Sequence, residues 1–250
     1  MKNDMTRRFA LNLGLSAAGL AVTSCAAPAA AQPKAKPAPP PPARRLSLLA
    51  APEEKKVVPL PFDATKFEGL SEKLLTMHHQ KNYAGAVKKL NLIRGKLQSA
   101  DAESSGSYWS EFGTLKAGEA AARNSALLHE LYFSNMIGGG NEVPPALGTA
   151  LSSRFGSLDA AVKRMRGCAK ATSGWVILAI DRTSRTIEIV QTAGHAGGAW
   201  HAEALIVLDV FEHSYAIDYG PDKDGYLDAF FKNLNWVEIG ERFDAALARG

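Results

Sequence analysis

Cysteine is nearly absent from this chain of 250 residues, which contains only Cys25 and Cys168. Processing at or after Cys25 would leave Cys168 alone in the folded region, so no intrachain disulfide can form there. A structural zinc site built from paired thiolates is excluded for the same reason. We expect Cys168 to be an inert core thiol and not a nucleophile.

A strong charge of either sign is also missing, because the formal net charge is only +4. Domains that bind nucleic acid usually carry a pronounced basic surface, so we expect no nucleic-acid partner. No spanning helix is indicated at the N-terminus either. The uncharged run over residues 9–24 is shorter than the roughly 20 apolar residues that a transmembrane helix needs.

The first 25 residues have the order of an export signal. Lys2, Arg7 and Arg8 precede the uncharged run, and small residues follow it, as in secretory signals. The pair Arg7-Arg8 followed by Phe9 resembles a twin-arginine signal, whose route carries folded proteins. We therefore interpret residues 1–25 as a twin-arginine or lipoprotein-type signal and expect a protein exported to the periplasm.

Two cleavage sites fit this signal. Val22-Thr23-Ser24-Cys25 resembles a bacterial lipobox, which would leave a lipidated Cys25 as membrane anchor, whereas Ala29-Ala30-Ala31 is an ordinary small-residue site. We favour the lipobox. The following residues 26–56 include a proline run and lack apolar periodicity, so we expect a Pro-rich linker in extended polyproline form.

Helical periodicity dominates residues 57–142. Apolar residues recur at helical spacing over residues 70–97, with Lys and Arg between them, which predicts a long amphipathic helix. A second helix is predicted over residues 119–136. Two antiparallel helices would bring His78 of the first beside His129 of the second, so we predict a helical-hairpin domain.

Residues 143–250 mix helix and strand patterns. In chain order we expect short helices at 146–155 and 158–168 and strands at 175–180, 186–190 and 204–208, after which helical periodicity returns over 226–247. The first two strands flank a polar turn, as in a β-hairpin. The predicted fold class is α+β: an N-terminal antiparallel helical hairpin and a C-terminal α/β domain with a three-stranded antiparallel sheet.

Histidine is confined to the middle of the chain. The six residues are His78, His79, His129, His195, His201 and His213, and the last follows Asp209 by four positions. Imidazole nitrogens and a carboxylate suit a borderline transition metal, so the pattern predicts a metal site assembled from distant segments. We expect His79 and His201 to be structural; on a helix, His79 must face about 100° away from His78.

A series of short motifs spans nearly the whole exported domain. In chain order they are Leu60-Pro61-Phe62, Met77-His78-His79-Gln80-Lys81, Lys89-Leu90-Asn91, His129, Gly138-Gly139-Gly140-Asn141-Glu142-Val143-Pro144, Ser173-Gly174-Trp175-Val176, Asp209-Val210-Phe211-Glu212-His213-Ser214-Tyr215-Ala216-Ile217-Asp218-Tyr219 and Asn235-Trp236. Together they resemble the iron/manganese superoxide dismutase family. The Asp-x-x-Glu-His element with Tyr and Asn-Trp downstream is specific in combination.

The resemblance implies an enzyme that disproportionates superoxide to dioxygen and hydrogen peroxide at one iron or manganese ion per subunit. Position by position, it makes His78, His129, Asp209 and His213 the metal ligands, with a bound water or hydroxide as the fifth. Zinc does not fit this activity because it is redox-inert.

The resemblance also assigns two catalytic residues, His195 and Trp175. His195 lies where members often carry a glutamine, and some a histidine, that contacts the bound solvent; this inclines us towards iron or dual use. The alternative is that His195 is a solvent-exposed loop residue. The Trp175 side chain would form one wall of the metal site. Glu212 would reach across a homodimer interface to the partner's His213.

The chain departs from the family at the gateway to the metal. Ala86 replaces the usual gateway tyrosine, Asn82 replaces its hydrogen-bonding companion, and Ala216 replaces a tyrosine expected from the partner subunit. Phe211 replaces a usual tryptophan. We predict a wider substrate channel with altered proton delivery.

Three other functions compete with this one. The first is an exported metal-binding lipoprotein with little or no catalytic turnover. An iron(II) oxygenase would need open coordination positions, and three histidines plus Asp209 leave less room for them. A zinc metalloprotease is rejected, because His129-Glu130 begins an H-E-x-x-H pattern that then has Phe133 in place of the second histidine.

Overall fold

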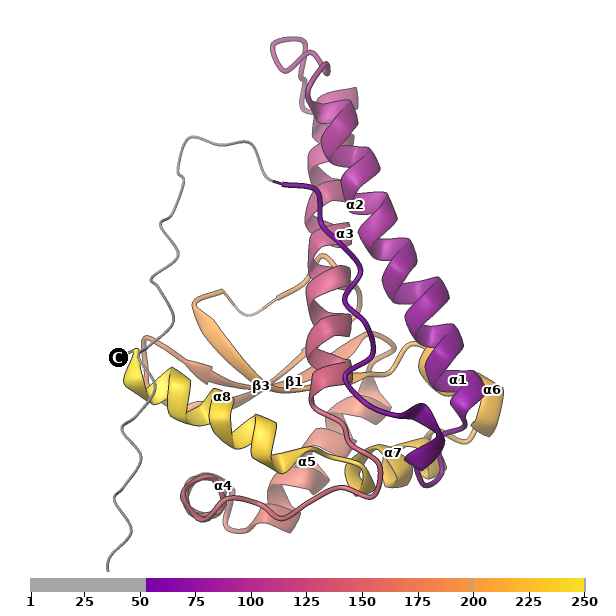
Figure 1. Ribbon diagram of the computed structural model, residues 1–250. Helices are drawn as coiled ribbons and strands as arrows, with labels where there is room; N and C mark the ends of the chain where they lie inside the picture. Colours follow the sequence, from indigo (N-terminus) through magenta and orange to yellow (C-terminus); the bar gives the residue numbers. More distant parts are fainter. Residues whose placement is uncertain (1–52, 199, 250) are drawn as a thin grey trace, which may run out of the picture. The chain divides into compact units, whose positions relative to one another are not determined.

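A pair of long antiparallel helices and a three-stranded sheet form the frame on which the other helices pack (Figure 1). The structure is a computed structural model that describes residues 53–198 and 200–249. Its elements are a 3₁₀ turn (Ala64–Lys66), α1 (Glu72–Met77), a π-helical turn (His78–Tyr83), α2 (Ala84–Leu97), α3 (Glu111–Ser134), α4 (Pro145–Phe155), α5 (Leu158–Ala171), β1 (Trp175–Asp181), β2 (Ile187–Thr192), β3 (Ala202–Asp209), a second 3₁₀ turn (Glu212–Ser214), α6 (Ala216–Tyr219), α7 (Lys223–Lys232) and α8 (Trp236–Ala248). The predicted α+β fold class is confirmed.

Serine caps begin both arms of the helical hairpin. The hydroxyl of Ser71 accepts a hydrogen bond from the Leu74 N–H, and that of Ser110 accepts one from the Gly113 N–H, each at 3.0 Å. These bonds satisfy backbone donors that the first helical turn leaves free. Between α1 and α2, however, the predicted continuous helix is interrupted by the π turn, a feature that often occurs at functional sites.

The sheet has the order β2-β1-β3, with both neighbours antiparallel to β1. Every residue of β1 except its last is buried, as expected for a central strand that reads as a continuous apolar run. The helices α3 and α8 contact β3, and α5 contacts β1 and β2. The register pairs Trp175 of β1 with Asp209 of β3, so these two residues lie side by side at one end of the sheet.

The helical periodicity expected over residues 226–247 is divided between two separate helices, α7 and α8. Asn233, which lies between them, is fully buried. Its Oδ1 accepts from the Gly139 N–H at 2.9 Å, and its Nδ2 donates to the Glu68 carbonyl at 2.8 Å. A buried amide that bonds to distant backbone groups thus ends the helical pattern at this point.

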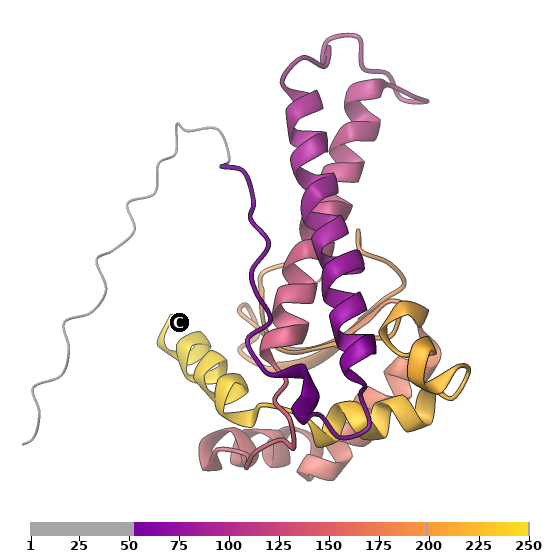
Figure 2. The ribbon, with the colours of Figure 1, turned by 45° about the vertical axis from the view of Figure 1, so that its right-hand side comes forward.

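One buried hydrophobic cluster draws on the hairpin, the sheet and α8, and the partly buried Cys168 packs against it. A strap of extended chain, residues 53–60, runs beside the hairpin (Figures 1 and 2). The signal over residues 1–25 and all but the end of the linker 26–56 lie outside the described residues, and the division at residue 142 stays a prediction. Within the described ranges, no helix combines the length and apolarity needed to cross a membrane.

Candidate metal centre

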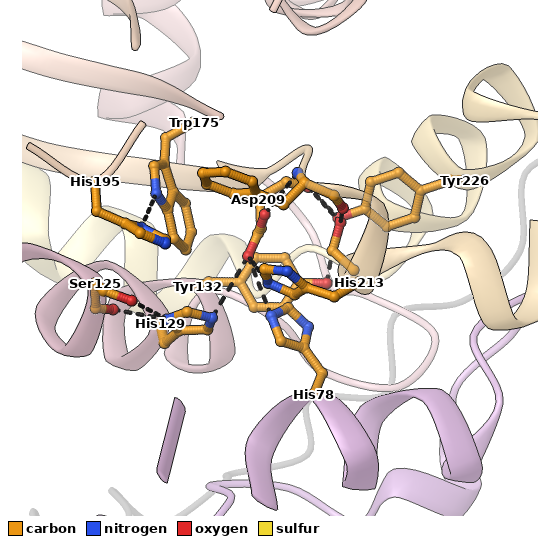
Figure 3. A network of polar contacts seen from close by, with 11 residues as sticks. His78, Ser125, His129, Tyr132, Trp175, His195, Asp209, His213 and Tyr226 are labelled. Carbon is orange, nitrogen blue, oxygen red and sulfur yellow. Dashed lines mark hydrogen bonds and ion pairs between the residues drawn. The ribbon is translucent and has the colours of Figure 1, made fainter. Parts of the chain in front are cut away.

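Four side chains from separate segments converge at one buried point (Figure 3). His78 comes from the π turn, His129 from α3, Asp209 from the end of β3, and His213 from the 3₁₀ turn that follows. Each offers one possible ligand atom, and these atoms all lie within 4.8 Å of one another. The fold therefore brings together the four residues that the sequence nominated as metal ligands.

Asp209 lies at the centre of the group. Its Oδ2 is 3.1 Å from His78 Nε2, 3.2 Å from His213 Nε2 and 3.6 Å from His129 Nε2, while Oδ1 accepts from the Phe211 N–H at 2.9 Å. Burial alone would raise the pKa of Asp209, but hydrogen bonds from His213 and His78 outweigh it and hold that pKa well below its usual value. The carboxylate is ionised and can balance the charge of a cation.

His129 is held in the tautomer that a metal ligand needs. Its Nδ1–H donates to the Ser125 carbonyl at 2.7 Å, so the lone pair lies on Nε2. That Nε2 is buried and has no hydrogen-bond partner in the described part of the chain. Burial also lowers the pKa of His129 to about 3. A buried, unpaired imidazole nitrogen beside an ionised carboxylate fits a bound transition-metal ion.

Apolar and aromatic side chains enclose the centre. The His78 ring lies 5.0 Å from the ring of Tyr132 and 5.1 Å from that of Phe133, measured between centroids. Burial lowers the pKa of His78, which keeps its imidazole neutral. Sequence reasoning missed one supporting residue, Tyr226, whose hydroxyl donates to the Asp209 carbonyl at 2.6 Å. No local motif signals this contact, since 17 positions separate the two residues.

His195 and Trp175 lie next to the four-residue group and contact each other. The indole Nε1–H of Trp175 donates to His195 Nδ1 at 3.0 Å, so the imidazole proton of His195 is on Nε2. Burial lowers the pKa of His195, which keeps the ring neutral. Its centroid is 6.3 Å from that of His129. His195 is only partly exposed, unlike a solvated loop residue.

A hollow of about 420 Å³ lies between α2 and α3 and reaches His195. Small side chains account for much of its lining, among them Ala86 of α2 and Ala122 of α3, and Asn82 of the π turn also lines it. Phe211 stacks on His195 from another side, with centroids 4.6 Å apart. Of the residues that depart from the resemblance at the gateway, Asn82 and Ala86 line this hollow, whereas Ala216 is exposed on α6.

The remaining two histidines lie apart from the four-residue group. His79 Nε2 donates to the Val58 carbonyl at 2.8 Å. His201 is exposed and adopts a left-handed backbone conformation, with φ of 63°. Neither belongs to the four-residue group, in keeping with the structural roles expected for them.

Three imidazoles and one carboxylate around a single buried point define a mononuclear transition-metal centre of nitrogen and oxygen donors. Comparison with known proteins identifies its family. Residues 144–242 match the family described as "Iron/manganese superoxide dismutases, C-terminal domain". An iron superoxide dismutase of Cupriavidus metallidurans is 36% identical over 192 residues, which cover 76% of this chain and 96% of that protein.

Two further relatives are similar to this chain, one named as a manganese enzyme and one as an iron enzyme. A manganese superoxide dismutase of Halobacterium salinarum is 36% identical over 200 residues, covering 78% of this chain and 98% of that protein. An iron superoxide dismutase of Aquifex pyrophilus is 35% identical over 185 residues, covering 72% and 87%. The chain belongs to the iron/manganese superoxide dismutase family.

Proposed function

We propose that this chain is a superoxide dismutase, which converts two superoxide anions and two protons into one dioxygen and one hydrogen peroxide. The observation that carries this proposal is the buried convergence of His78, His129, Asp209 and His213 within 4.8 Å. Relatives that are named iron or manganese superoxide dismutases and match over most of their length support it. When bound, iron or manganese supplies one-electron chemistry between its divalent and trivalent states.

The surrounding residues would orient the reactants and hold a proton. Asp209 supplies the buried negative charge, and the Ser125 carbonyl fixes the tautomer of His129. Trp175 occupies Nδ1 of His195, so the Nε2–H of His195 is left to donate to solvent or to superoxide beside the centre. Because such a donor shifts the potential of the metal, we propose iron, or use of both metals, as the native cofactor.

The hollow beside His195 supports a remodelled gateway. Ala86 contributes only a methyl group to its lining, and Asn82 presents a short amide. We propose that superoxide enters through a wider channel and that proton delivery and product inhibition are altered. Ala86→Tyr should change both turnover and inhibition by peroxide, whereas Ala120→Tyr, on an exposed position of α3, should not. Identical turnover and inhibition in wild type and Ala86→Tyr would contradict this gateway.

The same small side chains favour one alternative, an exported metal-binding protein with little or no turnover. The two functions differ in a single assay. Protein loaded fully with iron or with manganese should remove superoxide if it is an enzyme. A fully metallated sample that is inactive with either metal would establish the alternative and refute the enzyme.

We also propose that the protein is a homodimer whose interface includes the Glu212-His213 region. Glu212 is exposed, and the His213 side chain is 26% exposed in the single chain, so a partner carboxylate would reach it. Sedimentation of wild type and Glu212→Gln tests this interface; equal dimerisation would refute the role of Glu212.

For cellular location we propose the periplasm, with a lipid on Cys25 as anchor. Cys25→Ala should release the protein from the membrane fraction. A soluble wild-type protein would instead indicate cleavage at the small-residue site, and retention in the cytoplasm would refute export.

A further inference from the structure

The strap at residues 53–60 is bonded to the helical hairpin at two of its residues. Both backbone groups of Val58 are satisfied by side chains of the π turn: its N–H donates to the Tyr83 hydroxyl at 2.8 Å, and its carbonyl accepts from His79 Nε2 at 2.8 Å. The side-chain amide of Asn91 bonds to both backbone groups of Lys55, at 3.0 and 2.8 Å. The strap therefore has a fixed register along the hairpin.

Tyr83 connects this strap to the helix that carries His129. Its hydroxyl donates to Glu130 Oε1 at 2.7 Å, and Glu130 directly follows His129 on α3. Lys55 Nζ lies 2.8 Å from the same carboxylate oxygen. One phenol group thus joins three segments: the π turn that begins at His78, the ligand-bearing part of α3, and the strap.

The π turn is what allows both of its end residues to face inward. On an α-helix, residues five apart point about 140° away from each other. In a π turn, hydrogen bonds run to the carbonyl five residues back, and here the Ala84 N–H donates to the His79 carbonyl. His78 and Tyr83 are accordingly both buried, at 1% exposure each. An α-helical turn would direct one of these two side chains away from the interior.

The protonation of this link is defined by its partners. Burial raises the pKa of Tyr83 above its usual value, so the phenol keeps its single proton. Because Val58 brings an N–H donor, that proton must go to the Glu130 carboxylate. The ammonium group of Lys55 lies 2.8 Å from the same carboxylate oxygen, so the phenol and the ammonium group share one acceptor.

We propose that Tyr83 is a positioning residue of the metal centre, whose hydroxyl holds the π turn against α3 and thereby sets the spacing of His78 and His129. The imidazole centroids of these two residues are 5.0 Å apart. The Tyr83 ring is 6.3 Å from that of His129, so Tyr83 acts through the segments it joins and does not bind the ion. The role rests on the proposed metal centre and adds a determinant of its geometry.

The experiment compares Tyr83→Phe with Tyr219→Phe in metal-free protein titrated with Co²⁺. Tyr219 is a matched control, because its hydroxyl also bonds within the fold, to the Gly69 carbonyl, but it lies on α6. Co²⁺ affinity is measured by competition with a chromophoric chelator, and the visible absorption of bound Co²⁺ reports coordination geometry. Melting of the metal-free proteins records the loss of stability separately.

We expect Tyr83→Phe to bind Co²⁺ about 10-fold more weakly, as typical for lost support of a metal ligand, with an altered visible spectrum. Tyr219→Phe should keep the wild-type affinity and spectrum even where its melting temperature falls. Wild-type affinity and spectrum in Tyr83→Phe would overturn the positioning role. Failure of the wild type itself to bind Co²⁺ would instead refute the metal centre, and this role with it.

Glu130→Gln provides a second test that does not depend on the folding of Tyr83→Phe. The amide keeps the side-chain shape but loses the charge that Tyr83 and Lys55 contact. Its control is Glu119→Gln, which alters an ion-paired carboxylate on the same helix. A weaker Co²⁺ affinity in Glu130→Gln alone would support the link, and equal affinities in both variants would overturn it.

Discussion

Replacing Asp209 with asparagine should abolish metal binding while preserving the metal-free fold. The substitution keeps the side-chain shape and an oxygen for the Phe211 N–H, but it removes the charge that lies within 3.6 Å of three imidazole nitrogens. An ion at about 1,000 times its dissociation constant stabilises the folded protein by about 4 kcal/mol. For a domain of this size, that corresponds to about 8–16 °C in melting temperature.

Thermal melting with and without Mn²⁺ measures this effect directly. We expect the full upward shift in wild type and none in Asp209→Asn, because the remaining imidazoles cannot balance the charge of the ion. Asp218→Asn is the control: its exposed carboxylate accepts hydrogen bonds from Ser71 at 2.7 Å, away from the centre, and the metal-dependent shift should persist. If Mn²⁺ raised the melting temperature of Asp209→Asn as much as that of wild type, with one bound ion per chain, the ligand role of Asp209 would be refuted.

Three further outcomes follow from the geometry. His195→Ala removes the partner of the Trp175 indole; we expect normal metal content and turnover lower by about 10–100-fold, and unchanged turnover in pulse radiolysis would count against its role. Tyr226→Phe loses the 2.6 Å bond to the Asp209 carbonyl and should lower the free energy of unfolding by about 1–3 kcal/mol in urea; no loss would show that this bond contributes nothing. Because burial lowers the pKa of His129 to about 3 from its usual 6.5, the unfolded state takes up the proton first as pH falls. From this residue alone, the free energy of unfolding of the metal-free protein should therefore be highest above pH 6.5 and fall by about 2 kcal/mol down to pH 5. A free energy of unfolding that rises as the pH falls over this range would contradict the neutral, buried imidazole.

Most of the fold follows from patterns that act locally. Apolar residues at helical spacing account for α2 and α3, and the apolar runs that flank a polar turn account for β1 and β2. The break between α7 and α8 could not be read in the same way, because Asn233 bonds to Gly139 and Glu68, far away in sequence. The π turn was hidden for a different reason: its six residues are almost all polar, so no apolar spacing distinguishes it from an α-helical turn.

The ligand group was accessible from sequence because His78, Asp209 and His213 lie in recognisable motifs, and the predicted helical hairpin places His129 beside His78. An antiparallel hairpin brings His78 beside His129, and Asp209 ends a strand of the same fold. The hydrogen-bonded link through Tyr83 could not be predicted from the sequence. Its partners Glu130 and Val58 are 47 and 25 positions away, and only the three-dimensional packing of strap, π turn and α3 brings them together.

Superoxide removal by metal-loaded protein tests the proposed function most directly. Metal-free protein is loaded separately with iron and with manganese, its metal content is determined, and the decay of superoxide is followed by pulse radiolysis. We expect one ion per chain and catalytic decay with at least one of the two metals, and none with metal-free protein. One ion per chain with no acceleration by either metal would contradict a superoxide dismutase and leave a metal-binding protein.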